Sequence, residues 1–249
     1  MDVGFGNRIL SVKGVSLYVI MLGPPGAGKS TQAPALAAHL GIRSLAAGDL
    51  FRAIAASGTE LGRDLDARMR RGDLLPDELV VRLISERLRS VDFEQGAVLD
   101  GCPSTIEQAV GLDRELELRG QRFEHVVHLY APINVLLERL SHRASAHRAG
   151  EAAAGAPSTF PSGNSEGQHN SQDRTSRRQD DAPHVVRRRL EVYIQNIKPV
   201  VEYYQAQGVV REVMADAPKE VVKARVLRAI GVRSSFPDVG RDEDEKQSF

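Results

Sequence analysis

Residues 23–30 read GPPGAGKS and match the pattern G-x-x-x-x-G-K-[ST]. An apolar run at 17–22 (LYVIML) precedes this segment, and a stretch with helical periodicity at 30–40 follows it. Glycines in such a strand–loop–helix unit let successive backbone N–H groups turn toward one phosphate, and the helix N-terminus adds partial positive charge. The alternative is a Gly/Pro turn that matches by chance, which both flanking elements disfavour. The segment therefore predicts a loop that binds the phosphates of a nucleoside triphosphate.

The side chains at the end of this loop suit the same ligand. A lysine in this position reaches the β- and γ-phosphates, and a hydroxyl in the next one or two positions faces Mg²⁺. We therefore expect a nucleoside triphosphate as ligand and Mg²⁺ as cofactor. The residues that we expect to bind the triphosphate here are Gly26, Ala27, Gly28, Lys29, Ser30 and Thr31.

Strand-like and helical segments alternate along most of the chain. Short apolar runs suit buried strands, and longer stretches place apolar residues on one helical face. This alternation predicts an α/β fold with a central parallel sheet flanked by helices, and together with the phosphate loop it indicates a three-layer fold of the P-loop type. The expected strands are 97–99, 125–130 and 209–213, and the expected helices are 77–90, 105–119, 133–142, 182–207 and 219–230.

Composition narrows the classes of function. The 249 residues suit one large domain, and the 33 basic residues balance the 33 acidic ones. A net charge of zero gives no bulk attraction to nucleic acid or to an acidic membrane. Cys102 is the single cysteine, so no intrachain disulfide can form, and no Cys/His cluster has zinc spacing. We expect a cytoplasmic protein with no zinc, no nucleic-acid partner and no membrane segment.

Two regions are too polar to form a core. Residues 144–176 are rich in Ala, Gly, Ser, Asn and Gln, and residues 231–249 form an acidic tail. Such segments cannot bury enough apolar surface to offset the entropy of ordering. We predict that both are disordered.

Several further segments occur in the order typical of one family. Each is a weak signal alone, but together with the phosphate loop they resemble the adenylate kinase family of nucleoside monophosphate (NMP) kinases. The segments are AGDLFR at 47–52, GDLLPDEL at 72–79, DGCPST at 100–105, ERLSHR at 138–143, and RQDD at 178–181 followed by RRRL at 187–190.

The resemblance implies a single domain over 1–230, with an NMP-binding lobe at 46–75 and a LID at 142–181. It also implies a monomer that reversibly transfers a phosphoryl group from ATP to AMP, giving two ADP in a Mg²⁺-dependent reaction. Such transfer requires two repelling anions to be held in line, which suits converging guanidinium groups.

Site residues follow from the resemblance position by position. The expected catalytic residues are Lys29, Arg143, Arg178 and Arg189, and Arg139 and Arg143 join the loop in binding ATP. Asp49 and Asp100 are expected to orient Mg²⁺ through water. The expected NMP-binding residues are Ala47, Arg52, Asp73, Leu74, Leu75, Gly101, Ser104, Gln108, Arg178 and Arg189.

Each of these residues could instead have a purely structural role. The arginines could lie on solvated helix faces, Asp49 could only cap a helix, and Gln108 could be a surface residue. Ser104 stands where the family carries an arginine that binds the acceptor phosphate, and Cys102 replaces a phenylalanine. Ala47 resembles the UMP/CMP kinases instead. The rival hypotheses are therefore a UMP/CMP-type kinase, a catalytically weakened nucleotide-binding relative, and a kinase for another small acceptor.

Overall fold

The structure is a computed structural model that describes residues 16–141 and 183–232, except for the side chains of 183–186 and 189. The predicted insertion at 144–176, the whole of the predicted LID at 142–181, and all but the first two residues of the predicted tail at 231–249 lie outside the described residues. The strands are β1 (Leu17–Leu22), β2 (Arg43–Ala46), β3 (Gly96–Asp100), β4 (Phe123–Tyr130) and β5 (Val210–Met214). The helices are α1 (Lys29–Leu40), α2 (Ala47–Ala55), α3 (Glu60–Arg71), α4 (Asp77–Leu88), the 3₁₀ turn η1 (Val91–Phe93), α5 (Ile106–Glu117), α7 (Pro183–Ala206), α8 (Lys219–Ala229) and an unlabelled one over 133–141.

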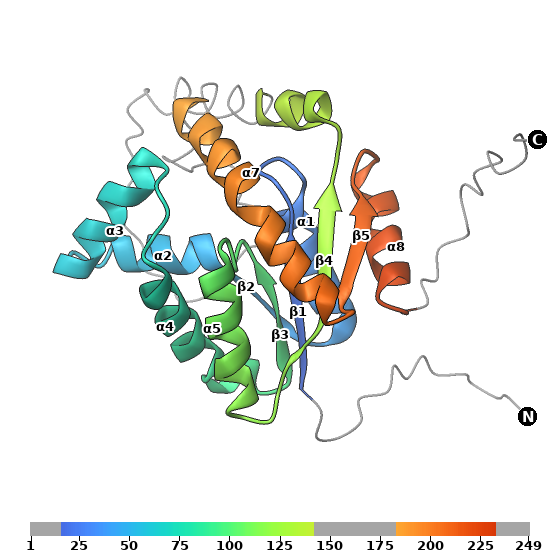
Figure 1. Ribbon diagram of the computed structural model, residues 1–249, viewed down its shortest axis with the longest axis horizontal. Coiled ribbons are helices and arrows are strands. Elements are labelled where there is room, and N and C mark those ends of the chain that lie inside the picture. The colour runs from blue at the N-terminus through green and yellow to red at the C-terminus, as the bar shows by residue number, and fades with distance from the viewer. Residues whose placement is uncertain (1–15, 142–182, 233–249) are drawn as a thin grey trace, which may run out of the picture.

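The five strands form one parallel sheet in the order β2-β3-β1-β4-β5 (Figure 1). The first strand therefore lies at the centre, and the chain moves to one side of it for β2 and β3 and to the other side for β4 and β5. In an open parallel sheet, ligands bind beyond the carboxyl ends of the strands, where the strand order reverses. The loop that follows β1 lies at this position.

Two apolar clusters cover the two faces of the sheet. Alternate residues of β1 enter different clusters, because side chains of a strand point to opposite faces. Tyr18, Ile20 and Leu22 pack with residues of α4, α5 and α7. Val19 and Met21 pack with residues of α1 and α8. The predicted three-layer α/β fold is thus confirmed.

Two strands, β2 and β4, differ from what the sequence predicted. The short strand β2 was not predicted, because its four residues carry little periodic signal. β4 begins two residues earlier than expected, and its pairing with β1 shifts register between Tyr18 and Val19. The Glu124 carboxylate accepts a hydrogen bond from the Tyr18 backbone N–H at 3.0 Å beside this irregularity. A side chain therefore replaces a ladder bond, which no apolar pattern reveals.

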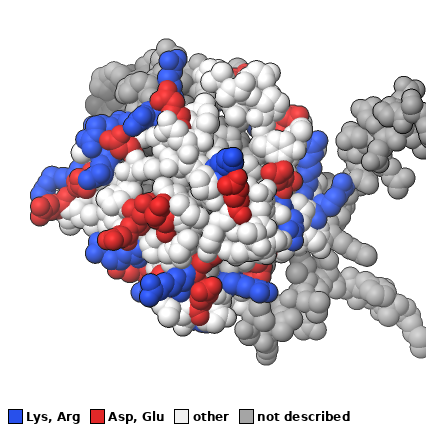
Figure 2. Space-filling model, in the orientation of Figure 1, with Lys and Arg blue, Asp and Glu red and all other residues white. Residues whose placement is uncertain are grey.

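Charges of both signs are mixed over the face of the molecule in Figure 2, in keeping with the balanced composition. A helix long and apolar enough to cross a bilayer is absent from residues 16–141 and 183–232.

Candidate functional site

A cavity of about 710 Å³ lies beyond the carboxyl ends of the strands. Its volume is within the range typical of small-molecule sites. Residues from the glycine-rich loop, from the segment after β3 and from α2, α7 and α8 line it. Among the predicted site residues, those in the wall are Gly26, Ala27, Gly28, Lys29, Ser30, Thr31, Arg52, Asp73, Leu74, Leu75, Asp100, Gly101, Ser104, Gln108 and Arg139.

The loop between β1 and α1 is built by its glycines. Gly23, Gly26 and Gly28 have φ values of 148°, 86° and 94°, which other residues rarely adopt. The loop is tightly folded, since the Ala27 N–H donates to the Pro24 carbonyl at 3.1 Å. A side chain at Gly23 would also meet the Leu129 carbonyl oxygen at 2.6 Å. Glycine is therefore required here for two independent reasons.

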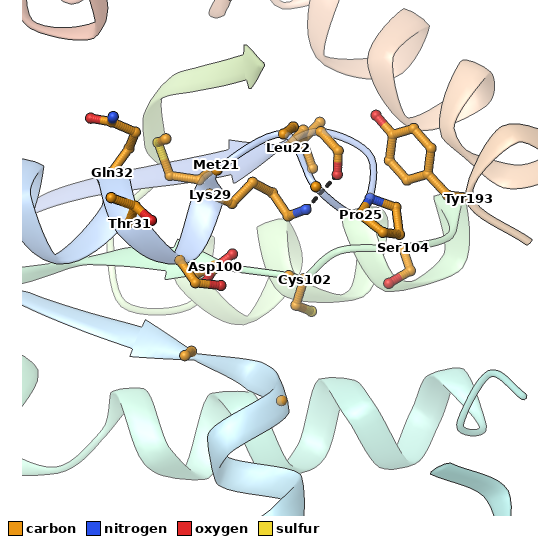
Figure 3. A pocket seen from close by; sticks show the side chains of 18 of the residues that line it. Met21, Leu22, Pro25, Lys29, Thr31, Gln32, Asp100, Cys102, Ser104 and Tyr193 are labelled. Atoms are coloured by element: carbon orange, nitrogen blue, oxygen red, sulfur yellow. Dashed lines mark hydrogen bonds between the residues drawn. The ribbon is translucent and has the colours of Figure 1, made fainter. Parts of the chain in front are cut away.

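Lys29 lies across the mouth of this loop. Its Nζ donates to the carbonyl oxygen of Gly23 at 2.6 Å (Figure 3) and to that of Pro24 at 3.1 Å. The ammonium group is thereby held over the concave side of the backbone, where a phosphate would meet successive N–H groups. This arrangement suits a polyphosphate ligand.

Asp100 is a buried carboxylate in the cavity wall, with only 6% of its surface exposed. It ends β3 in register with Met21, so it lies beside the start of the glycine-rich loop, and Figure 3 places it near Thr31. No side chain of the described residues donates a hydrogen bond to it. Carboxylate and hydroxyl oxygens are the ligands that Mg²⁺ prefers. Asp100, Ser30 and Thr31 thus fit a magnesium ion.

The wall opposite the loop is held by side-chain hydrogen bonds. Gln108 is buried, and its Oε1 accepts from the Ser104 backbone N–H at 2.7 Å. Its Nε2 donates to Asp77 Oδ1 at 2.9 Å, and the Thr105 hydroxyl donates to the same oxygen at 2.7 Å. Gln108 is therefore a cavity residue with a fixed amide, and not an exposed residue of α5.

Two predicted residues of α2 do not line the cavity, namely Ala47 and Asp49. Ala47 is buried against the apolar cluster. The Asp49 carboxylate accepts from Arg52 Nη2 at 2.5 Å, one turn along the same helix, whereas Arg52 itself does line the cavity. Asp49 thus neutralises and orients the guanidinium at this distance.

The structure describes the side chain of only one of the four arginines predicted to surround the phosphates. Arg139 lines the cavity and its Nη2 donates to the Ala217 carbonyl at 3.4 Å. Arg143 and Arg178 lie outside the described residues, and so does the side chain of Arg189. The backbone of Arg189 belongs to α7, one turn before Tyr193.

Tyr193 is a cavity residue that the sequence did not single out (Figure 3). Its hydroxyl lies 3.0 Å from Nε2 of His128 on β4, which is in register with Leu22 next to the loop. Burial lowers the pKa of His128, the nearby charge of Lys29 adds to this, and Glu212 opposes it. Burial also raises the pKa of Tyr193 well above its usual range. No local motif marks either residue, since 65 positions separate them.

The cavity thus joins the glycine-rich loop to a second wall that contains most of the residues predicted to bind the acceptor nucleotide. A family model for adenylate kinase matches residues 21–209. The chain belongs to the adenylate kinase family.

Individual relatives agree over most of the chain. The adenylate kinase of Lachnospira eligens is 38% identical over 220 residues, which cover 86% of this chain and 100% of that protein. The adenylate kinase of Magnetococcus marinus is 40% identical over 202 residues, covering 79% of this chain and 92% of that protein. The adenylate kinase of Thermus thermophilus is 39% identical over 218 residues, which cover 88% of this chain and 99% of that protein. The protein is accordingly a phosphotransferase with adenylate kinase function.

In the described part of the chain, no group of three or more His, Cys, Asp or Glu side chains could hold a metal ion by itself. A magnesium ion at Asp100 would therefore depend on phosphate and water oxygens for its other ligands, as is usual for this ion.

Proposed function

We propose that the two walls of the cavity bind two nucleotides, with ATP on the glycine-rich loop and AMP on the wall of Gln108. One cavity with both walls supports this proposal most strongly. The loop offers backbone N–H groups, Lys29 and a helix N-terminus to the triphosphate. The second wall offers Arg52 to the phosphate and Gln108 to the base of the acceptor.

The protein's own groups would act by positioning and by charge. Phosphoryl transfer requires little covalent chemistry from the enzyme, so the barrier falls mainly when the reactants are aligned and the developing charge is neutralised. Lys29 would follow the transferring phosphoryl group, and Arg139, Arg143, Arg178 and Arg189 would surround the phosphates from the LID side. Asp100 and Ser30 or Thr31 would hold Mg²⁺, which neutralises phosphate charge when bound. Asp49 would orient Arg52 more directly than it would a metal ion.

The roles of Asp73, Leu74, Leu75, Gly101 and Ser104 follow from the same geometry. They line the cavity between α3 and the segment after β3, where they would enclose the acceptor nucleotide. Family likeness further supports a monomer in the cytoplasm and an NMP-binding lobe at 46–75 that moves with the LID. The lobe contains α2 and α3, which contact each other more than they contact the sheet.

The acceptor can be tested by measuring ADP formation from ATP with AMP, UMP, CMP or GMP in turn. We expect turnover with AMP to exceed that with the other three acceptors, and to require Mg²⁺. Asp100→Asn should raise the Mg²⁺ concentration needed for half-maximal turnover, and Asp49→Asn should raise the Michaelis constant for AMP instead. Preference for UMP or CMP would favour the UMP/CMP-type alternative that Ala47 suggests. ATP binding without turnover on any acceptor would favour the weakened relative.

A further inference from the structure

The amide of Gln108 has neighbours of opposite and fixed polarity. A carboxylate accepts hydrogen bonds and a backbone N–H only donates them. Asp77 Oδ1 lies 2.9 Å from Nε2, and the Ser104 nitrogen lies 2.7 Å from Oε1. Rotating the amide by half a turn would place its NH₂ against the Ser104 N–H and its oxygen against the carboxylate. Both hydrogen bonds would be lost, so the structure allows one orientation of this amide.

Of the two groups that fix the orientation of the Gln108 amide, Asp77 is the one that acts through its side chain. It opens α4, whereas Gln108 lies 31 residues later in the first turn of α5. The same Oδ1 accepts the Thr105 hydroxyl at 2.7 Å, which fixes the carboxylate in turn. Gln108 and Thr105 are 2% and 6% exposed, so water competes little for these bonds. Asp77 does not line the main cavity, so it does not contact a ligand there directly, and its hydrogen bond to Gln108 connects it to the cavity wall.

A fixed amide can distinguish two classes of purine. A glutamine amide pairs with the edge of adenine by offering one N–H donor and one oxygen acceptor. On its N1 edge, adenine presents the 6-amino donor beside the N1 acceptor, whereas a 6-oxopurine presents the 6-oxo acceptor beside an N1–H donor. An amide that can rotate satisfies either order, but an amide of fixed orientation satisfies only one. Within the described residues, the second N–H of Nε2 has no protein acceptor and remains available to a ligand.

We propose that Asp77 is a specificity-determining positioning residue, which makes the acceptor site select 6-aminopurine over 6-oxopurine nucleotides by preventing rotation of the Gln108 amide. The inference rests on the proposed contact between Gln108 and the acceptor base. AMP and IMP are the matched ligands for testing it, because they differ only in the group at position 6 and in the proton on the adjacent N1.

The experiment measures kcat/KM with AMP and with IMP and compares their ratio among variants. Asp77→Asn keeps the shape but allows either polarity to face Gln108, so the AMP:IMP ratio should fall roughly tenfold, as for the loss of one charged hydrogen bond. Glu78→Gln is the control, because it removes the same charge from the same helix turn at an exposed residue without a contact to Gln108. Asp77→Ser provides a second variant, since serine is also favourable at a helix start.

Gln108→Leu separates the two proposals. If Gln108→Leu lowers the ratio and both Asp77 variants keep the wild-type ratio, the role of Asp77 is overturned while the acceptor site stands. If Gln108→Leu leaves the ratio unchanged, the proposed contact with the base is wrong and the inference falls with it. If Asp77→Asn lowers the ratio in the wild-type background but not in Gln108→Leu, and Glu78→Gln does not lower it, the inference holds. A purely structural role would lower activity on AMP and IMP equally.

Discussion

The two walls of the cavity are built in different ways. The donor wall, where we propose that ATP binds, is the glycine-rich loop and consists of consecutive residues. Its hydrogen bonds are local, because Lys29 Nζ donates to the Gly23 and Pro24 carbonyls within the same loop. The acceptor wall comes from α2, α4 and the segment from β3 to the start of α5, and side-chain hydrogen bonds from Thr105 and Gln108 to Asp77 join that segment to α4. The backbone wall suits any triphosphate, because phosphates are alike. In the proposed function the acceptor wall distinguishes nucleotide bases through its side chains, so single substitutions there should change the preference for the acceptor.

The largest effect should come from the donor wall. Lys29→Met removes the cation that we propose acts on the transferring phosphoryl group, and kcat should fall roughly 100- to 1,000-fold, as for the loss of one preorganised charge-stabilising donor. Steady-state ADP formation measures this, with a melting curve as control for the fold. A loss below tenfold would show that the arginines carry the charge stabilisation without Lys29.

The next effect distinguishes strain from steric clash within the loop. The Cβ added by Gly28→Ala would have no neighbouring atom within 4 Å, but the residue would keep a φ of 94°. The left-handed backbone conformation alone should therefore lower the free energy of unfolding by about 1–2 kcal/mol. Gly23→Ala should cost more, because its Cβ also meets the Leu129 carbonyl oxygen at 2.6 Å. Urea unfolding of both variants measures the difference. Equal costs would mean that the β4 backbone moves aside freely.

A smaller effect is expected on the acceptor wall, where a substitution should strengthen the binding of AMP. Ser104 lines the cavity where the family carries an arginine, and its backbone N–H rather than its side chain binds Gln108. Ser104→Arg should lower the Michaelis constant for AMP roughly tenfold by restoring one charged hydrogen bond. The constant for ATP serves as the internal control. If neither AMP binding nor turnover improves, another cation already binds the acceptor phosphate.

The smallest effect concerns the contact between β4 and α7. The folded pKa of His128 lies below the ordinary value of 6.5, so the unfolded chain binds more protons between these two values. The contribution of His128 to stability is therefore fully present above pH 6.5 and is lost as the pH falls from there through the folded pKa. Wild type should lose more stability than His128→Gln between about pH 7.5 and about pH 5.5. The groups that face the imidazole, Lys29, Glu212 and Tyr193, are the same in both proteins.

Urea unfolding at both pH values measures this difference. His125, whose pKa is also lowered by burial and by Arg211, cancels in the comparison. Identical losses in the two proteins would mean that His128 is protonated as easily in the fold as in the unfolded chain. Tyr193→Phe should cost about 1 kcal/mol at neutral pH, as one net hydrogen bond.

Much of the fold could be predicted from the sequence. β1 has the predicted bounds, and α4, α5, α7 and α8 lie within two residues of expectation at each end, because apolar periodicity reports one buried face. The strand β2 was missed, since four residues are too few to show a period. At the site, Gln108 and Arg52 line the cavity, and their predicted contacts with the acceptor nucleotide stay predictions, whereas the Asp49 carboxylate accepts a hydrogen bond from Arg52.

The amino-acid sequence by itself determined the phosphate loop and the parallel sheet. Both depend on local rules, namely which residues accept positive φ and which alternate between buried and exposed faces. Only the tertiary structure decided the partners of Gln108 and His128, which come from positions 31 and 65 residues away. The orientation of a side chain depends on the donors and acceptors that folding brings to it, and no spacing along the chain encodes them.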